Sequence, residues 1–406
     1  MNVMTTGTGP GRAPRATLTA CTLLLLAQPF APAYAGPNEQ AKRIYERIAG
    51  IPPSAAELTQ MTNAICGGAC AAGAAPGSAS LVQAAAVATS APSFYNVTLK
   101  NFAMPWTNRD ATVFSPLNDY VATVIGMVRD NVPFNTALSA DILYTSSASG
   151  LPAPSPANNN HYATAEQNGV DLMATLVAGT QSGVYGTPTA ATAGLITTRG
   201  AASAFFINGT NRAMFRFTMI NHFCNDMPTL MDTTRPSDRI RQDVARSPGG
   251  DSRIFLNNCV GCHSGMDPMV QAFAYYDFDA TAGQMVYTPG QVQPKYLINA
   301  FNFPFGFVTP DDSWSNRWRT GPNTVLGWAA GLPGSGNGAK SLGQELAASA
   351  TFAQCQVSKV FQAVCFRAPL SSTDLATVSS ITSSFTSGGY NLKQVFQQTA
   401  AACPGS

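Results

Sequence analysis

The chain has 406 residues, and its 23 Lys and Arg nearly balance its 21 Asp and Glu. Charged residues make up only 11% of the sequence, against roughly a quarter in average globular proteins. A weakly charged and balanced surface argues against nucleic acid and acidic membrane surfaces as partners.

The N-terminus has the pattern of a cleaved secretory signal. Arg12 and Arg15 precede an apolar run over residues 16–27, which is too short to span a bilayer. Ala33-Tyr34-Ala35 then supplies small residues at both specificity positions of a signal-peptidase site. An uncleaved anchor would need a longer apolar run, and Cys21 is poorly placed for lipid attachment because the apolar run follows it. We therefore interpret residues 1–35 as a signal peptide and expect a periplasmic, extracellular or cell-surface protein without a membrane span.

Periodic apolar residues predict a series of helices separated by long loops. Ser54-Ala-Ala-Glu57 is a capping box that opens the second of them, and Asn391 is placed to cap the last. Stretches rich in Ser, Pro, Gly and Asn at 146–160 and 179–194 indicate loops. The expected helices cover residues 38–49, a segment after Glu57, 117–130, 209–224, 237–246, 342–366, 373–385 and 392–401.

These patterns predict a mostly α fold, with helical subdomains joined by irregular loops. We expect the N-terminal helical domain to cover residues 36–195 and a central segment 196–290. A loop-rich and helical region over 291–406 completes the chain, including an irregular stretch at 283–340 that has room for a short hairpin.

Signal cleavage leaves eight cysteines, and an oxidising compartment makes disulfides their default use. Cys66 and Cys70 are four residues apart, close enough to bridge on a helix. If Cys355 and Cys365 share one helix, they lie about 15 Å apart and cannot bridge each other. Each would then pair with Cys224 or Cys403, and the spacing does not decide which.

The remaining two cysteines form the motif Cys259-Val-Gly-Cys262-His263. Two thiols three positions apart on a helical turn can both reach the vinyl groups of one haem, and the adjacent imidazole can reach its iron. We therefore predict one covalent haem c on a short helix that Asp251 caps and that stops at Asp267-Pro268. A zinc site would need two more ligands in a chain with three histidines, and a plain Cys259–Cys262 disulfide is the other alternative.

The sequence does not determine the sixth iron ligand. Met285 and His222 are candidates, although core packing explains the first equally well and a hydrogen-bonded histidine the second. An axial Met or His would indicate electron transfer, whereas an open iron face would indicate ligand binding or peroxide chemistry. Arg246 and Arg253 are close enough in sequence to pair with haem propionates.

Several segments resemble an uncharacterised bacterial group of exported cytochrome c domain proteins of the planctomycete and myxobacterial type. The similar segments are 209–213, 221–224, Cys259-Val-Gly-Cys-His-Ser-Gly-Met-Asp-Pro268, Phe278-Asp279, 342–367 and 390–392, with 43–53 near the start. The resemblance implies a haem c on Cys259, Cys262 and His263, and no catalytic residue. The chain departs from the group at Met269, where relatives commonly have Gly after Asp-Pro.

The leading hypothesis is an exported monohaem cytochrome that transfers electrons to a redox partner protein, with the oligomeric state undetermined. One alternative is a haem-dependent peroxidase or oxygenase with an open iron site. Another is a surface binding protein whose haem is auxiliary.

Overall fold

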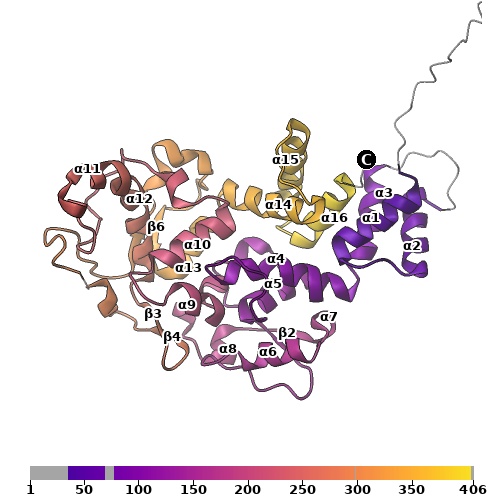
Figure 1. The fold of residues 1–406 in the computed structure, drawn as a ribbon, viewed down its shortest axis with the longest axis horizontal. Coiled ribbons are helices and arrows are strands. Elements are labelled where there is room, and N and C mark those ends of the chain that lie inside the picture. Colours follow the sequence, from indigo (N-terminus) through magenta and orange to yellow (C-terminus); the bar gives the residue numbers. More distant parts are fainter. Residues whose placement is uncertain (1–34, 69–76, 298, 404–406) are drawn as a thin grey trace, which may run out of the picture. The chain divides into compact units, whose positions relative to one another are not determined.

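Helices make up most of the chain in the computed structural model, which describes residues 35–68, 77–297 and 299–403 (Figure 1). The mostly α class is therefore confirmed. The proposed signal, residues 1–35, lies outside the described residues except for its last position. The α-helices are α1 (Pro37–Ala49), α2 (Ala55–Cys66), α3 (Ser78–Ala88), α4 (Lys100–Ala103), α5 (Asp119–Arg129), α6 (Asn160–Gln167), α7 (Leu172–Thr175), α8 (Gln181–Tyr185), α9 (Arg199–Phe205), α10 (Arg212–Phe223), α11 (Ser252–Ile254), α12 (Val260–Val270), α13 (Gly338–Ala347), α14 (Ala350–Cys365), α15 (Ser372–Ser387) and α16 (Leu392–Ala402).

Six short strands form three separate antiparallel pairs in the described ranges. β1 (Leu143–Ser146) pairs with β2 (Leu176–Gly179), and β3 (Tyr276–Asp279) pairs with β4 (Gln284–Tyr287). β5 (Ser313–Ser315) pairs with β6 (Ser335–Asn337) inside the stretch where a short hairpin had room to form. Each pair fixes loops between helices rather than forming a sheet core.

The first three helices pack on one another and against α16 near the C-terminus (Figure 1). Ala41, Ile44 and Ile48 on α1 are fully buried, at the helical spacing that the sequence predicts. The capping box of α2 is present, with the Ser54 hydroxyl accepting from the Glu57 amide and the Glu57 carboxylate accepting from the Ser54 amide. The Asn391 side chain caps α16 as expected.

α5 lies in the middle of the core, with every residue from Asp119 to Val128 buried. A helix that is buried on all sides needs apolar residues around its whole circumference, which explains its continuous apolar sequence. It contacts α4, α9 and β1, and contacts group residues Ala35–Ser406 into one unit. The subdomain boundaries expected at 195 and 290 remain predictions.

Two disulfides answer the pairing question that the sequence left open. Cys224 bonds to Cys355 and Cys365 bonds to Cys403. Because α14 runs unbroken from Ala350 to Cys365, the prediction that its two cysteines do not bridge each other is confirmed. The expected Cys66–Cys70 bridge involves Cys70, which lies outside the described residues.

The helix expected at residues 237–246 is not formed. Backbone groups of Ile240 and Gln242 bond instead to Phe303 and Phe307, and the side chain of Arg241 is buried. Ile240 and Val244 pack in a small apolar cluster with Phe255 and Val260. These tertiary contacts outweigh a local helical preference that is weak over ten residues.

The helix stop expected at Asp267-Pro268 is also wrong. α12 continues through Pro268 to Val270 and then tightens into a 3-10 turn over Gln271–Phe273. Met269 and Val270 are fully buried, so packing holds the last turn despite the hydrogen bond that proline cannot donate.

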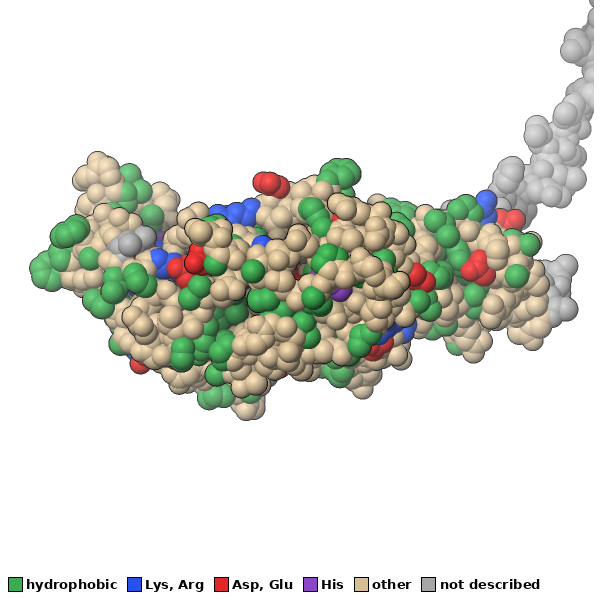
Figure 2. Space-filling view, turned by 90° about the horizontal axis from the view of Figure 1, so that it is seen from below, with side chains coloured by type: hydrophobic (Ala, Val, Ile, Leu, Met, Phe, Trp, Pro, Cys, Tyr) green, Lys and Arg blue, Asp and Glu red, His purple; other side chains and the backbone are tan. Residues whose placement is uncertain are grey.

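The surface reflects the scarcity of charge in the sequence. Figure 2 shows a face on which Lys, Arg, Asp and Glu are sparse between apolar and uncharged polar side chains. None of the helices in the described ranges is both long and apolar enough to cross a bilayer.

Candidate functional site

The Cys259–His263 motif lies at the start of α12. α11 leads through a π-helical turn, Phe255–Cys259, directly into α12, so the motif sits on continuous helical backbone. Asp251 caps this segment by accepting from the Arg253 amide, as the sequence predicts. Cys259 and Cys262 are the free cysteines of the part of the chain that the structure describes, which removes the disulfide alternative.

Both thiols are partly buried. The Cys262 thiol donates to the Met227 carbonyl at 3.5 Å, and burial raises its pKa, with Cys259 and Asp226 adding to the rise. Cys259 packs beside the cluster of Ile240, Val244, Phe255 and Val260. A raised thiol pKa is the opposite of what a nucleophilic or redox-active Cys-x-x-Cys pair requires.

His263 presents one ring nitrogen to the protein and leaves the other unengaged. Its Nδ1 lies 3.2 Å from both carboxylate oxygens of Asp267, one helical turn later. Within the described ranges no hydrogen bond uses Nε2. The carboxylate can only accept, so Nδ1 donates to it, and in the neutral imidazole this leaves the Nε2 lone pair to a metal.

Asp267 is held as a buried carboxylate by two arginines. Burial alone would raise its pKa, but Arg212, His263 and Arg241 together keep the pKa well below its usual range. Arg212 donates from Nε and Nη2 to the two oxygens of Asp267 at 2.8 and 2.9 Å. From the sequence, Asp267 was expected only as part of the helix stop, and its contact with His263 was not predicted. Its position four residues after His263, one helical turn away, was the signal that could have predicted the contact.

Two glycines let neighbouring segments pack directly on the motif helix. A Cβ on Gly261 would lie 2.2 Å from the Met231 Cγ, and a Cβ on Gly265 would lie 1.9 Å from the Trp318 Nε1. Trp318 is fully buried, while Met231 is 46% exposed and Leu256, three residues before Cys259, is 56% exposed. Exposed apolar side chains thus lie against Gly261, between the two thiols, and on the segment just before Cys259.

Gly265→Ala is expected to destabilise the protein by roughly 1 to 3 kcal/mol, because the added methyl group forces Trp318 or α12 to move. Urea denaturation followed by tryptophan fluorescence measures the change. Gly331→Ala is the control, because a Cβ there meets nothing within 4 Å and should leave stability within about 0.5 kcal/mol. Equal stabilities of the two variants would contradict the prediction.

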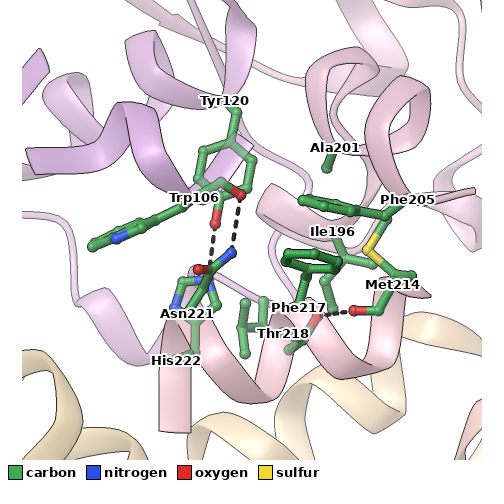
Figure 3. Close-up of a pocket in the computed structure, with 11 residues that line it drawn as sticks. Trp106, Tyr120, Ile196, Ala201, Phe205, Met214, Phe217, Thr218, Asn221 and His222 are labelled. Atoms are coloured by element: carbon green, nitrogen blue, oxygen red, sulfur yellow. Dashed lines mark hydrogen bonds between the residues drawn. The ribbon is translucent and has the colours of Figure 1, made fainter. Parts of the chain in front are cut away.

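His222 lies in a different place, on the wall of the small pocket shown in Figure 3. Its Nε2 is 2.9 Å from the Tyr120 hydroxyl and its Nδ1 is 3.4 Å from the Gln356 side-chain amide. Burial, with a smaller effect of Lys359, lowers its pKa to about 3. None of the described contacts joins His222 to His263.

The low pKa of His222 predicts an acid-sensitive fold. An unfolded chain binds a proton on this imidazole below its ordinary pKa of 6.5, whereas the folded chain resists protonation down to about 3. The stabilisation is therefore complete above pH 6.5 and is lost as the pH falls through that window. At pH 4.5 the loss is about 3 kcal/mol.

His222→Gln should remove that loss, so its free energy of unfolding should fall less between pH 7 and pH 4.5 than that of the wild type. Urea titrations of both proteins at the two pH values measure the difference. Parallel pH dependences would contradict the prediction.

Met285 is placed on β4 opposite Phe278. It lines a cavity of about 230 Å³ together with Tyr185, Arg199 and Tyr287, and no described contact joins it to His263. Arg246 is occupied by the carbonyls of Val244 and Ile240 and lies over the rings of Phe255 and Phe303. Arg253 is 82% exposed and pairs with Asp251.

Comparison with known proteins identifies no family for this chain. No protein-family model, no curated protein and no solved structure matches the chain. Within the described ranges, no group of three or more His, Cys, Asp or Glu side chains is arranged to hold a metal ion. The groups at the motif are two free thiols and an imidazole whose Nε2 makes no described hydrogen bond.

Proposed function

We propose that this chain is an exported monohaem c-type cytochrome that transfers electrons in the periplasm or at the cell surface. The observation that carries the proposal is the free state of Cys259 and Cys262 beside the unengaged Nε2 of His263, while four other cysteines are paired. The disulfides support an oxidising compartment, and the resemblance to exported cytochrome c domain proteins points the same way.

In this proposal Cys259 and Cys262 would hold the haem through thioether bonds, and His263 would ligate its iron. The haem, when bound, supplies a one-electron couple. The chain's own residues hold and orient that group. Helix α12 fixes the spacing of the thiols, Asp267 orients the imidazole, and Met231 and Leu256 offer apolar surface beside the thiols.

The test is an optical spectrum of the protein after expression with the cytochrome c maturation machinery. One haem per chain, with a low-spin reduced spectrum that carbon monoxide does not change, supports an electron carrier with a redox partner protein. A chain that carries no covalent haem under these conditions overturns the proposal.

A second candidate function, a haem peroxidase or oxygenase with an open iron site, is favoured by one observation. Both nitrogens of His222 are engaged by Tyr120 and Gln356, and Met285 lines a cavity with no described contact to His263. Neither predicted sixth ligand is therefore placed beside His263. A high-spin spectrum that shifts with carbon monoxide would select this candidate.

A further inference from the structure

The carboxylate of Asp267 lies against the ring of His263 in a place where it cannot reorient. Its side chain has 0% exposure, and both of its oxygens are 3.2 Å from the His263 Nδ1. The two residues are one turn apart on α12, so the helix backbone fixes their separation.

Arg212 fixes the carboxylate from the other side. This arginine opens α10 and grips both oxygens of Asp267 in a two-point pair. The same guanidinium holds Asp243 at 2.5 and 2.9 Å and the Thr210 hydroxyl at 2.9 Å. Segments far apart in sequence thus meet at Arg212, and Arg212 in turn holds the acceptor of the His263 ring proton.

The two carboxylates of the cluster, Asp267 and Asp243, are both compensated by arginines. Arg241 is buried 3.8 Å from Asp243, so two carboxylates face two guanidinium groups. The contact of this cluster with His263 is the hydrogen bond between Nδ1 and the Asp267 carboxylate. An anionic acceptor at that nitrogen makes the opposite nitrogen a stronger donor to a metal, and such partners of ligating histidines tune metal sites strongly.

We propose that Asp267, held in place by Arg212 and Asp243, is a positioning residue that fixes the tautomer of His263 and lowers the reduction potential of the haem. This inference rests on the proposed function. A stronger Nε2 donor stabilises ferric iron more than ferrous iron, so the hydrogen bond favours the oxidised state. The role goes beyond holding α10 to α12, because a purely structural ion pair would leave the potential unchanged.

The experiment is a redox titration of the haem-loaded protein and of Asp267→Asn, with dye mediators and the haem spectrum as readout. The amide keeps the shape of the side chain and removes its charge. The equilibrium should shift at least tenfold toward the reduced haem, which corresponds to 59 mV for one electron. Asp267→Glu retains the anionic acceptor, so its reduction potential should lie much closer to that of the wild type than to that of Asp267→Asn.

Asp226→Asn is the matched control. It removes a carboxylate from the segment whose Met227 carbonyl contacts the Cys262 thiol, but Asp226 bonds to Arg216 and not to His263. In Asp226→Asn the equilibrium between oxidised and reduced haem should move less than threefold. Equal shifts in Asp267→Asn and Asp226→Asn would show that only nearby charge matters and would overturn the inference.

Other outcomes separate the two proposals. Haem in the wild type and in Asp267→Asn, with the same potential in both, overturns this inference and leaves the proposed function standing. A wild type without haem overturns both. If Asp267→Asn does not fold, Asp243→Asn decides, because it leaves Arg212 to Asp267 alone and weakens that carboxylate as an acceptor. It should shift the equilibrium at least twofold toward the reduced haem, and no shift overturns the inference.

Discussion

Replacing Cys259 and Cys262 together with serine is expected to abolish covalent haem attachment while leaving the fold in place. These are the free thiols of the described residues, whereas Cys224, Cys355, Cys365 and Cys403 are paired in disulfides. Serine cannot form the thioether bonds that hold haem c. Haem staining after denaturing electrophoresis should therefore fall to background, and each single variant should keep one bond and an intermediate signal.

The control for this experiment is the pair Cys224→Ser with Cys355→Ser, which removes two cysteines without touching the motif. That variant should retain the haem stain in whatever protein it yields. Circular dichroism of the Cys259 and Cys262 variant should match the wild-type helix content. Denaturation-resistant haem in the double motif variant would contradict the assignment.

Removing the Cys224–Cys355 disulfide is expected to lower the free energy of unfolding by about 5 kcal/mol. The bond joins residues 131 positions apart, and the chain-entropy cost of closing so long a loop in the unfolded state gives this size. The Cys365–Cys403 bond closes a separation of 38 residues, for which the same relation gives about 4 kcal/mol. Urea titrations of the two double Cys→Ala variants measure both losses.

The ranking of the two losses in unfolding free energy tests the loop-length argument more strictly than their absolute sizes do. The longer loop should lose more, and dithiothreitol should bring the wild type to the stability of a chain without either bond. A greater loss from the Cys365 and Cys403 variant would contradict the loop-length argument and point to strain or residual structure in the unfolded chain.

Features that depend on neighbours in sequence were predictable. The Ser54 capping box, the Asn391 cap and the motif of Cys259, Cys262 and His263 are local patterns, and each lies on helical structure at the expected position. The rise per residue of a helix was enough to exclude a Cys355–Cys365 bond. The partners of Cys355 and Cys365 depend on how α10 and α16 pack on α14. Local residue spacing does not encode that packing.

Features that depend on distant contacts were not predictable. Arg212 reaches Asp267 across 55 positions, and the segment around Arg241 gives up a helix to bond with residues 303–307. Packing of Met269 and Val270 carries α12 past Pro268. His222 and Met285 remained candidates as sixth ligands because sequence distance from His263 says little about distance in space.

The docking of α16 against α1 and α3 has a consequence for the order in which the chain can mature. For a chain translocated N-terminus first, the opening helices emerge long before the segment that completes their packing. They stay incompletely buried until α16 arrives and the Cys365–Cys403 bond secures it. In the proposed function, the segment around Cys259 would emerge in that interval, so haem attachment could precede the packing of α16 on the N-terminal helices.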